Sequence, residues 1–136
     1  MDHQNAMVRG YLHTRKDFRT GSEFMKRKGI SDIWYRPPWG LTNLFSWHFV
    51  RKYGMKMVLW DVMAEDWERG ATAGSIRKKC LSRVKDGSIL CLHDGGRRTG
   101  GAPGAPEKTL EALTYVIPAL KEAGCRFILP SEAVFR

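Results

Sequence analysis

Short apolar runs alternate with amphipathic helical patterns along this chain, and the alternation limits the folds that it can adopt. Four runs rich in Val, Ile, Leu or aromatic residues end in polar or Pro/Gly breaks, at residues 32–35, 55–62, 88–92 and 126–129. Such runs are typical of strands. Strands that alternate with helices pair in parallel through right-handed crossovers. The sequence therefore predicts an α/β fold with a parallel sheet or barrel.

Helical periodicity fills the segments between and before these runs. Residues 42–53, 75–84 and 107–122 each place apolar side chains on one helix face. Residues 14–28 are also predicted to form a helix, although Gly21 interrupts the pattern. The apolar faces contain Leu44, Phe45, Phe49 and Val50 in the second helix, Ile76, Cys80, Leu81 and Val84 in the third, and Leu110, Leu113, Val116, Ile117 and Leu120 in the last.

Length and composition fit one domain or a part of one. The chain has 136 residues, of which 43% are apolar, enough for a packed core. It contains no run of 18 apolar residues and does not begin like a signal peptide, so we expect neither a membrane span nor an export signal in these residues. Its three cysteines are widely spaced, which favours buried free thiols over a disulfide framework or a metal knuckle.

Positive charge is concentrated in the first half of the chain. The net charge is +9, and residues 1–60 hold 11 Lys and Arg against 4 Asp and Glu. A basic half can attract nucleic acid or an acidic wall polysaccharide. The alternative is a solvated helix face, because many of these cations lie in or beside residues 14–28. We favour the solvated face and expect no nucleic-acid partner, since no RNA-binding or zinc-finger signature accompanies the charge.

Polar clusters follow three of the predicted strands. Residues 36–40 (Arg-Pro-Pro-Trp-Gly) follow the first, Asp66 and Trp67 follow the second, and His93 and Asp94 follow the third. Functional residues of parallel α/β folds gather at the carboxyl ends of the strands. A His there can serve as general acid or base, and an Asp can orient it. Each residue alone is better explained as structural, but their shared placement favours a hydrolytic pocket.

The same clusters carry a family resemblance. The run Arg36-Pro37-Pro38-Trp39-Gly40 resembles the third sequence motif of the polysaccharide deacetylase family (NodB-homology domain, carbohydrate esterase family 4). Asp66-Trp67 resembles the end of its fourth motif, and Leu90-Cys91-Leu92-His93-Asp94 resembles its fifth. The resemblance implies that residues 1–136 are the C-terminal portion of a distorted (β/α) barrel, a partial domain that lacks the N-terminal strands and the first motif.

The resemblance also implies an activity and a role for each matched residue. Members of this family are metal-dependent hydrolases that remove N-acetyl groups from an amino-sugar polysaccharide, chitin-like or peptidoglycan-like. A metal and a backbone N–H beside the third motif stabilise the oxyanion in that family. Carried over by position, the catalytic residues are His93 as the acid that protonates the amine, Asp66 as the residue that tunes it and Arg36 as the residue that orients the base. The substrate-binding residues are Trp39, through its N–H, and Trp67 and Leu92, which shape a slot for the acetyl methyl group.

The resemblance also implies a divalent metal, zinc or a similar ion, but the ligand motif for it is incomplete in this sequence. The family's second motif has the form HxxxH, and His3 lies 33 residues before Arg36, which leaves room for a loop and a full helix. His13 is the competing ligand, but Asp17 stands where the second His belongs. We prefer His3. Neither choice completes three protein ligands, so we expect weak or absent metal binding. Met63 also occupies a position that is often Asp in the family.

Three functions follow from these observations. The first is a polysaccharide deacetylase that is N-terminally truncated here, with exposed sheet edge and a tendency to self-associate. The second is a non-catalytic polysaccharide-binding remnant that uses Trp39, Trp67 and the basic half. The third is a binder of anionic polymers. Relatives in this family usually act outside the cytoplasm or at the cell wall, and these residues carry no signal for a compartment.

Overall fold

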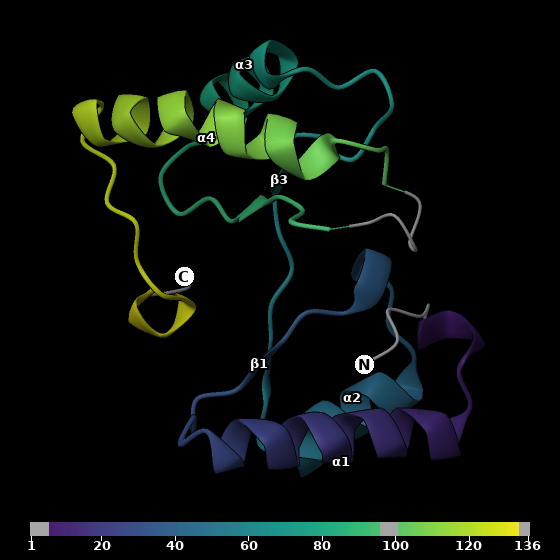
Figure 1. The fold of residues 1–136 in the computed structure, drawn as a ribbon. Helices are drawn as coiled ribbons and strands as arrows, with labels where there is room; N and C mark the ends of the chain where they lie inside the picture. Colours follow the sequence, from purple (N-terminus) through teal and green to yellow (C-terminus); the bar gives the residue numbers. More distant parts are fainter. Residues whose placement is uncertain (1–5, 96–100, 134–136) are drawn as a thin grey trace. The chain divides into compact units, whose positions relative to one another are not determined.

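The computed structural model describes residues 6–95 and 101–133, and the chain divides into two compact units. Unit 1 comprises Met1–Leu59, and unit 2 comprises Trp60–Arg136. In the described part of each unit, one pair of parallel strands and two longer helices form the framework (Figure 1). Parallel pairing of strands that alternate with helices confirms the predicted α/β class.

Unit 1 is built around an aromatic core. Its helices are α1 (Tyr11–Arg27) and α2 (Leu44–Lys52), its strands are β1 (Trp34–Tyr35) and β2 (Lys56–Met57), and it has short 3-10 turns η1 (Ala6–Val8) and η2 (Pro38–Gly40). The Phe18 ring of α1 lies 4.5 Å from the Tyr35 ring and 5.9 Å from the Phe49 ring, between centroids. Phe49 is fully buried. The core thus joins both helices to β1.

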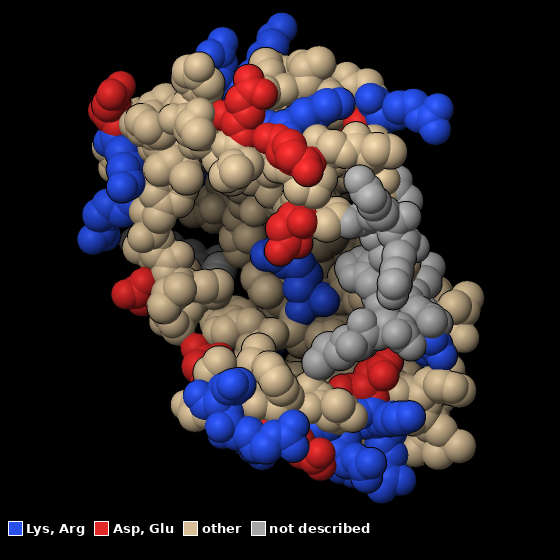
Figure 2. All heavy atoms as spheres, viewed as in Figure 1, with Lys and Arg blue, Asp and Glu red and all other residues tan. Residues whose placement is uncertain are grey.

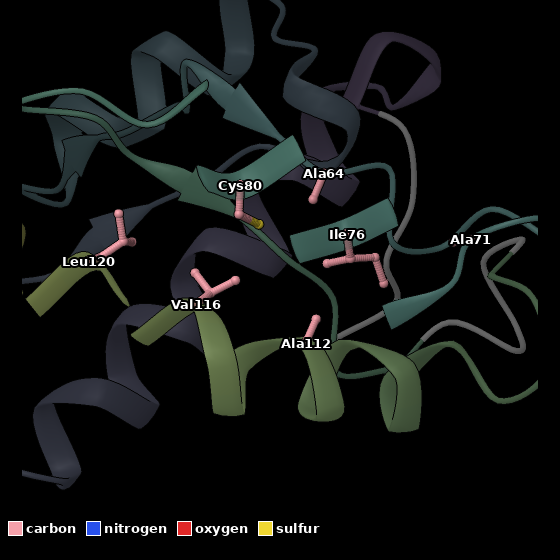
Figure 3. Close-up of a cluster of buried hydrophobic side chains, with 7 residues drawn as sticks. All are labelled: Ala64, Ala71, Ile76, Cys80, Ala112, Val116 and Leu120. Carbon is pink, nitrogen blue, oxygen red and sulfur yellow. The ribbon is translucent and has the colours of Figure 1, made fainter. Parts of the chain in front are cut away.

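Unit 2 is built around smaller side chains. Its strands are β3 (Val62–Met63) and β4 (Leu90–Cys91), its helices are α3 (Ala73–Arg83) and α4 (Ala105–Glu122), and the turn η3 (Pro130–Glu132) follows. Figure 3 shows its core side chains converging between the two helices and the chain after β3. These are Ala64, Ala71, Ile76, Cys80, Ala112, Val116 and Leu120. A capping box between Thr72 and Ser75 begins α3.

Two of the four predicted strands need correction. The run 55–62 is not one strand, because its hydrogen-bond partner changes: Lys56 N–H donates to the Ile33 carbonyl, whereas Val62 N–H donates to the Ile89 carbonyl. The run 126–129 forms no strand in the described structure, and its residues Phe127, Ile128 and Leu129 are exposed. Apolar composition alone does not create a strand, because strand formation depends on pairing and packing context. The other two runs contain β1 and β4.

The predicted helices are present, and two of them bury the predicted face only in part: Phe49 and Val50 of α2 and Val116 and Leu120 of α4 are buried as predicted. Helix α1 continues through the buried Gly21. In α2 the buried residues are Ser46, Phe49 and Val50, while Leu44 is 84% exposed. In α4 they are Ala105, Thr109, Ala112, Val116 and Leu120, while Leu110 is exposed. The first half of the buried face of α4 consists of small residues, which let the helix approach its neighbours closely.

The cations of helix α1 lie on its exposed face, as both the solvated-face interpretation and an anion-binding surface require. Its cations Arg15, Lys16, Arg19, Lys26 and Arg27 are all exposed, whereas Thr14, Phe18, Gly21 and Ser22 are buried. Figure 2 shows Lys and Arg side chains exposed over much of the face in view. None of the described helices has both the length and the apolar content that crossing a membrane requires.

Candidate active site

Asp66 is a fully buried carboxylate that follows β3. Its Oδ2 accepts a hydrogen bond from the His93 backbone N–H at 2.7 Å and from the Thr109 hydroxyl at 2.9 Å. Its Oδ1 lies 2.9 Å from His93 Nδ1. A buried carboxylate without such partners would be strongly unfavourable. Asp66 is therefore held by residues that follow β4 and lie in α4, with one oxygen directed at the His93 ring.

His93 combines this buried partner with an accessible ring. It lies two residues after β4, and its side chain is 39% exposed while that of Asp66 is 0% exposed. An ionised carboxylate can only accept, so in the neutral ring the proton is assigned to Nδ1. Nε2 is then the ring nitrogen that does not face Asp66. This arrangement can act as a general acid or base.

Trp67 packs against the His93 ring. The two rings meet edge to face, with centroids 4.9 Å apart and planes at 70°. The Trp67 carbonyl also accepts a hydrogen bond from Ala102 N–H at 2.8 Å, which ties the segment before α4 to the site. The structure thus brings together three of the predicted site residues, Asp66, Trp67 and His93. Leu92 is half-buried and packs against the core of unit 2, and its place in an acetyl slot stays a prediction.

Glu65 immediately precedes Asp66, and its side chain is bound to helix α3. It has a φ of 49°, which is unusual for a residue with a side chain. Its carboxylate pairs with Lys79 Nζ at 2.7 Å and with Arg83 Nη1 at 2.8 Å, one turn apart on α3. Arg83 also donates to the Met63 carbonyl. Hydrogen bonds from Lys79 and then Arg83 hold the pKa of Glu65 below its usual value. Helix α3 therefore fixes the turn that presents Asp66.

Thr109 is the site residue that sequence reasoning missed. It is buried on α4, and its hydroxyl is bonded to the Asp66 carboxylate. The apolar pattern of α4 placed Leu110, Leu113, Val116, Ile117 and Leu120 on the inward face. Val116 and Leu120 are buried, but the pattern gave Thr109 no role. Small residues at the helical spacing of Ala105, Thr109 and Ala112 were the available signal.

Arg36 and Trp39 belong to unit 1, whereas Asp66, Trp67 and His93 belong to unit 2. Arg36 is exposed directly after β1. Trp39 lies in η2, is 50% exposed and has a φ of 54°. A left-handed φ at a bulky residue costs free energy, and such strain is often found at functional sites. The orienting role of Arg36 and the N–H role of Trp39 stay predictions.

The described residues do not fit a three-ligand metal site. His3, the preferred ligand, lies outside the described residues. His13 is on the exposed face of α1. Within residues 6–95 and 101–133, no group of three or more His, Cys, Asp or Glu side chains is arranged to hold an ion. A divalent site needs such a set of oxygen, nitrogen or sulfur donors.

The cysteines behave as structural residues. Cys80 and Cys91 are buried, Cys125 is half-buried, and all three are free, as predicted. Burial, and then the negative charge of Asp66, raises the pKa of the Cys80 thiol. A thiol held in its protonated form is a poor nucleophile. Cys80 therefore contributes packing beside Asp66 rather than covalent chemistry.

Curated relatives that resemble the chain are deacetylases. A peptidoglycan-N-acetylglucosamine deacetylase of Bacillus cereus is 28% identical over 134 residues, which is 97% of this chain and 59% of the relative. A chitooligosaccharide deacetylase of Azorhizobium caulinodans is 35% identical over 94 residues, which is 66% of this chain and 44% of the relative. This chain is homologous to the polysaccharide deacetylases of carbohydrate esterase family 4. It spans about half the length of these family members, and no family model matches it.

Solved family 4 structures share the fold. A peptidoglycan N-acetylglucosamine deacetylase has a TM-score of 0.80 and 26% identity, covering 96% of this chain and 58% of that one. An acetyl xylan esterase from Clostridium thermocellum, solved with a cobalt ion, has a TM-score of 0.76 and 25% identity over 96% of this chain and 59% of its own. A family 4 pseudoenzyme from Bacillus anthracis has a TM-score of 0.75 at 20% identity, over 92% of this chain and 41% of its own. The predicted partial (β/α) barrel is confirmed.

Proposed function

We propose that this chain carries the proton-donating part of a site that removes N-acetyl groups from an amino-sugar polysaccharide. The observation that supports it is the pairing of a fully buried Asp66 with a partly exposed His93 at 2.9 Å, at the carboxyl ends of β3 and β4. Family 4 relatives named for peptidoglycan N-acetylglucosamine and for chitooligosaccharide support the substrate class.

The chemistry assigned to the pair is protonation of the departing nitrogen. Hydrolysis breaks the bond between the acetyl carbon and the amide nitrogen. Water supplies the hydroxyl group that makes acetic acid, and its remaining proton replaces, through solvent, the one that His93 gives to the nitrogen. The nitrogen must gain a proton to leave as an amine. His93 Nε2–H donates this proton, and Asp66 stabilises the imidazolium form from which it is donated. Trp67, packed edge to face on His93, limits the access of water to one side of the ring.

A non-catalytic polysaccharide-binding module is the second candidate. Trp39 is half exposed in unit 1 and can stack on a sugar ring. This candidate predicts saturable binding of chitooligosaccharide without release of acetate.

Acetate release separates the two candidates. Because the chain carries only the proton-donating part of the site, the test uses the protein extended upstream of Met1 and supplied with a divalent metal. We expect it to release acetate from chitooligosaccharide or peptidoglycan fragments, and we expect His93→Ala to reduce the rate by about 100-fold or more, the usual contribution of a general acid. His48→Ala is the matched control because His48 is exposed on α2 and outside the Asp66–His93 pair. Equal rates for His93→Ala and the wild type would contradict the proposed role. Binding of the same fragments without acetate would establish the second candidate.

A further inference from the structure

Thr109 contacts the proposed acid pair from a third element. Its side chain is buried in α4, with Oγ1 at 2.9 Å from Asp66 Oδ2 and at 3.0 Å from the Ala105 carbonyl oxygen. A hydroxyl has one proton to donate, and both neighbours are acceptors. An ionised carboxylate is the stronger acceptor, so the proton is drawn toward Asp66.

Rotation of the Asp66 carboxylate is the degree of freedom that this contact controls. The last torsion of an Asp side chain is soft and roughly two-fold, so a carboxylate held at one point can turn. Oδ2 receives two donors from different elements, the His93 backbone N–H and the Thr109 hydroxyl. With Oδ2 held in this way, Oδ1 is the oxygen left for the His93 ring, and it lies 2.9 Å from Nδ1.

We infer that Thr109 is a positioning residue for the Asp66–His93 pair: its hydroxyl fixes the carboxylate so that His93 keeps its proton on Nδ1 and presents Nε2 to the substrate. The inference rests on the proposed function for its catalytic consequence, but its structural part concerns the His93 ring alone.

The start of α4 is anchored to the same segment at a second point. Ala102 N–H donates to the Trp67 carbonyl, next to Asp66 in the chain, and the buried face of α4 around Thr109 consists of Ala105 and Ala112. Small side chains on this face allow the helix backbone to come close enough for a short hydroxyl to reach Asp66. The contact is thus a consequence of how α4 packs.

Paired variants test the hydroxyl separately from the shape of the side chain. Thr109→Val keeps the shape and removes the donor, and Thr109→Ser keeps the donor. Thr114→Val is the matched control on the same helix, because the exposed Thr114 hydroxyl bonds only the Glu111 carbonyl in the described structure. If Thr109→Val fails to fold, Thr109→Ala, which also lacks the donor, replaces it.

The first readout is nitrogen NMR of the His93 ring in the labelled chain, which needs no turnover. We expect a protected Nδ1–H signal in the wild type, Thr109→Ser and Thr114→Val, and loss of that signal with mixed ring tautomers in Thr109→Val. The second readout is acetate release, for which we expect kcat about tenfold lower in Thr109→Val with KM unchanged, and recovery in Thr109→Ser.

The outcomes distinguish this inference from the proposed function. An unchanged Nδ1–H signal in a folded variant without the hydroxyl would overturn the positioning role of Thr109. A lost signal in that variant, with no acetate released even by the wild type, would support the positioning role and contradict the catalytic proposal.

Discussion

Units 1 and 2 have the same kinds of elements but different interiors. The core of unit 1 consists of large aromatic side chains, with Phe18, Phe49 and Tyr35 in ring contact. The core of unit 2 consists mainly of small residues, and it encloses the charged Asp66 at 0% exposure. Large side chains fill space between elements, whereas small ones bring backbones close enough for a buried carboxylate to find three donors. The small residues of unit 2 thus accommodate the buried Asp66 and its contact with His93.

The largest expected effect is on the aromatic core. Phe49→Ala removes a fully buried ring and should lower the free energy of unfolding by about 3–5 kcal/mol, since a cavity adds to the lost burial. Phe45→Ala, on the same helix but 38% exposed, is the control and should cost much less. Urea unfolding measures both. Equal losses for the two variants would contradict the aromatic-core description of unit 1.

A smaller effect is expected from adding bulk to unit 2. Ala112 is fully buried on α4 between neighbours that are already in contact. Ala112→Leu should therefore destabilise the chain by about 1–3 kcal/mol through overpacking. Leu110→Ala, at a side chain that is 68% exposed on the same helix, should change stability by less than about 0.5 kcal/mol. A stabilising Ala112→Leu in thermal or urea unfolding would show that close approach of α4 is not needed.

The smallest expected effect is the pH-dependent contribution of Glu65. Its pKa is lowered from 4.5 in the folded chain, first by Lys79 and then by Arg83. A lowered folded pKa adds stability above the unfolded pKa, and that stability is lost as the pH falls through the folded pKa. The contribution at pH 7 should be below about 1 kcal/mol because the pair is partly exposed.

Glu65→Gln tests this sign. The stability difference between the wild type and Glu65→Gln should be present at pH 7 and should shrink as the pH is lowered below 4.5 in urea unfolding experiments. Glu111→Gln, at an exposed position of α4, is the control and should leave the pH dependence unchanged. A stability difference that grows on acidification would contradict the ion-pair description.

The sequence predicted the features that depend on local residue patterns and on which residues follow the strands. The alternating elements, the parallel pairing, and the positions of Asp66 and His93 after successive strands all follow from residue types and their order. Strand limits did not follow, because residues 56–58 bond to one neighbour and residues 61–63 to another. Whether an apolar run such as 126–129 becomes a strand depends on a partner edge, which a single sequence does not specify.

The contact of Thr109 could not be predicted because it depends on the rotation of α4 about its own axis. A pattern that weighs side chains by hydrophobicity turned Leu110 inward, yet Leu110 is 68% exposed. The buried face instead combines Thr109 and Ala112 with Val116 and Leu120, which the pattern had placed inward. The ion pairs of Glu65 with Lys79 and Arg83 likewise depend on where helix α3 packs, which the sequence pattern does not specify.

The central claim is that Asp66 holds the proton of His93 on Nδ1, and the ring tautomer tests it most directly. Nitrogen NMR of the neutral His93 ring should show the Nδ1–H form in the wild type. In Asp66→Asn the amide can donate to Nδ1, so the ring should change to the Nε2–H form while the His48 signals stay the same. A wild-type ring protonated on Nε2, or the same His93 tautomer in both proteins, would contradict the account.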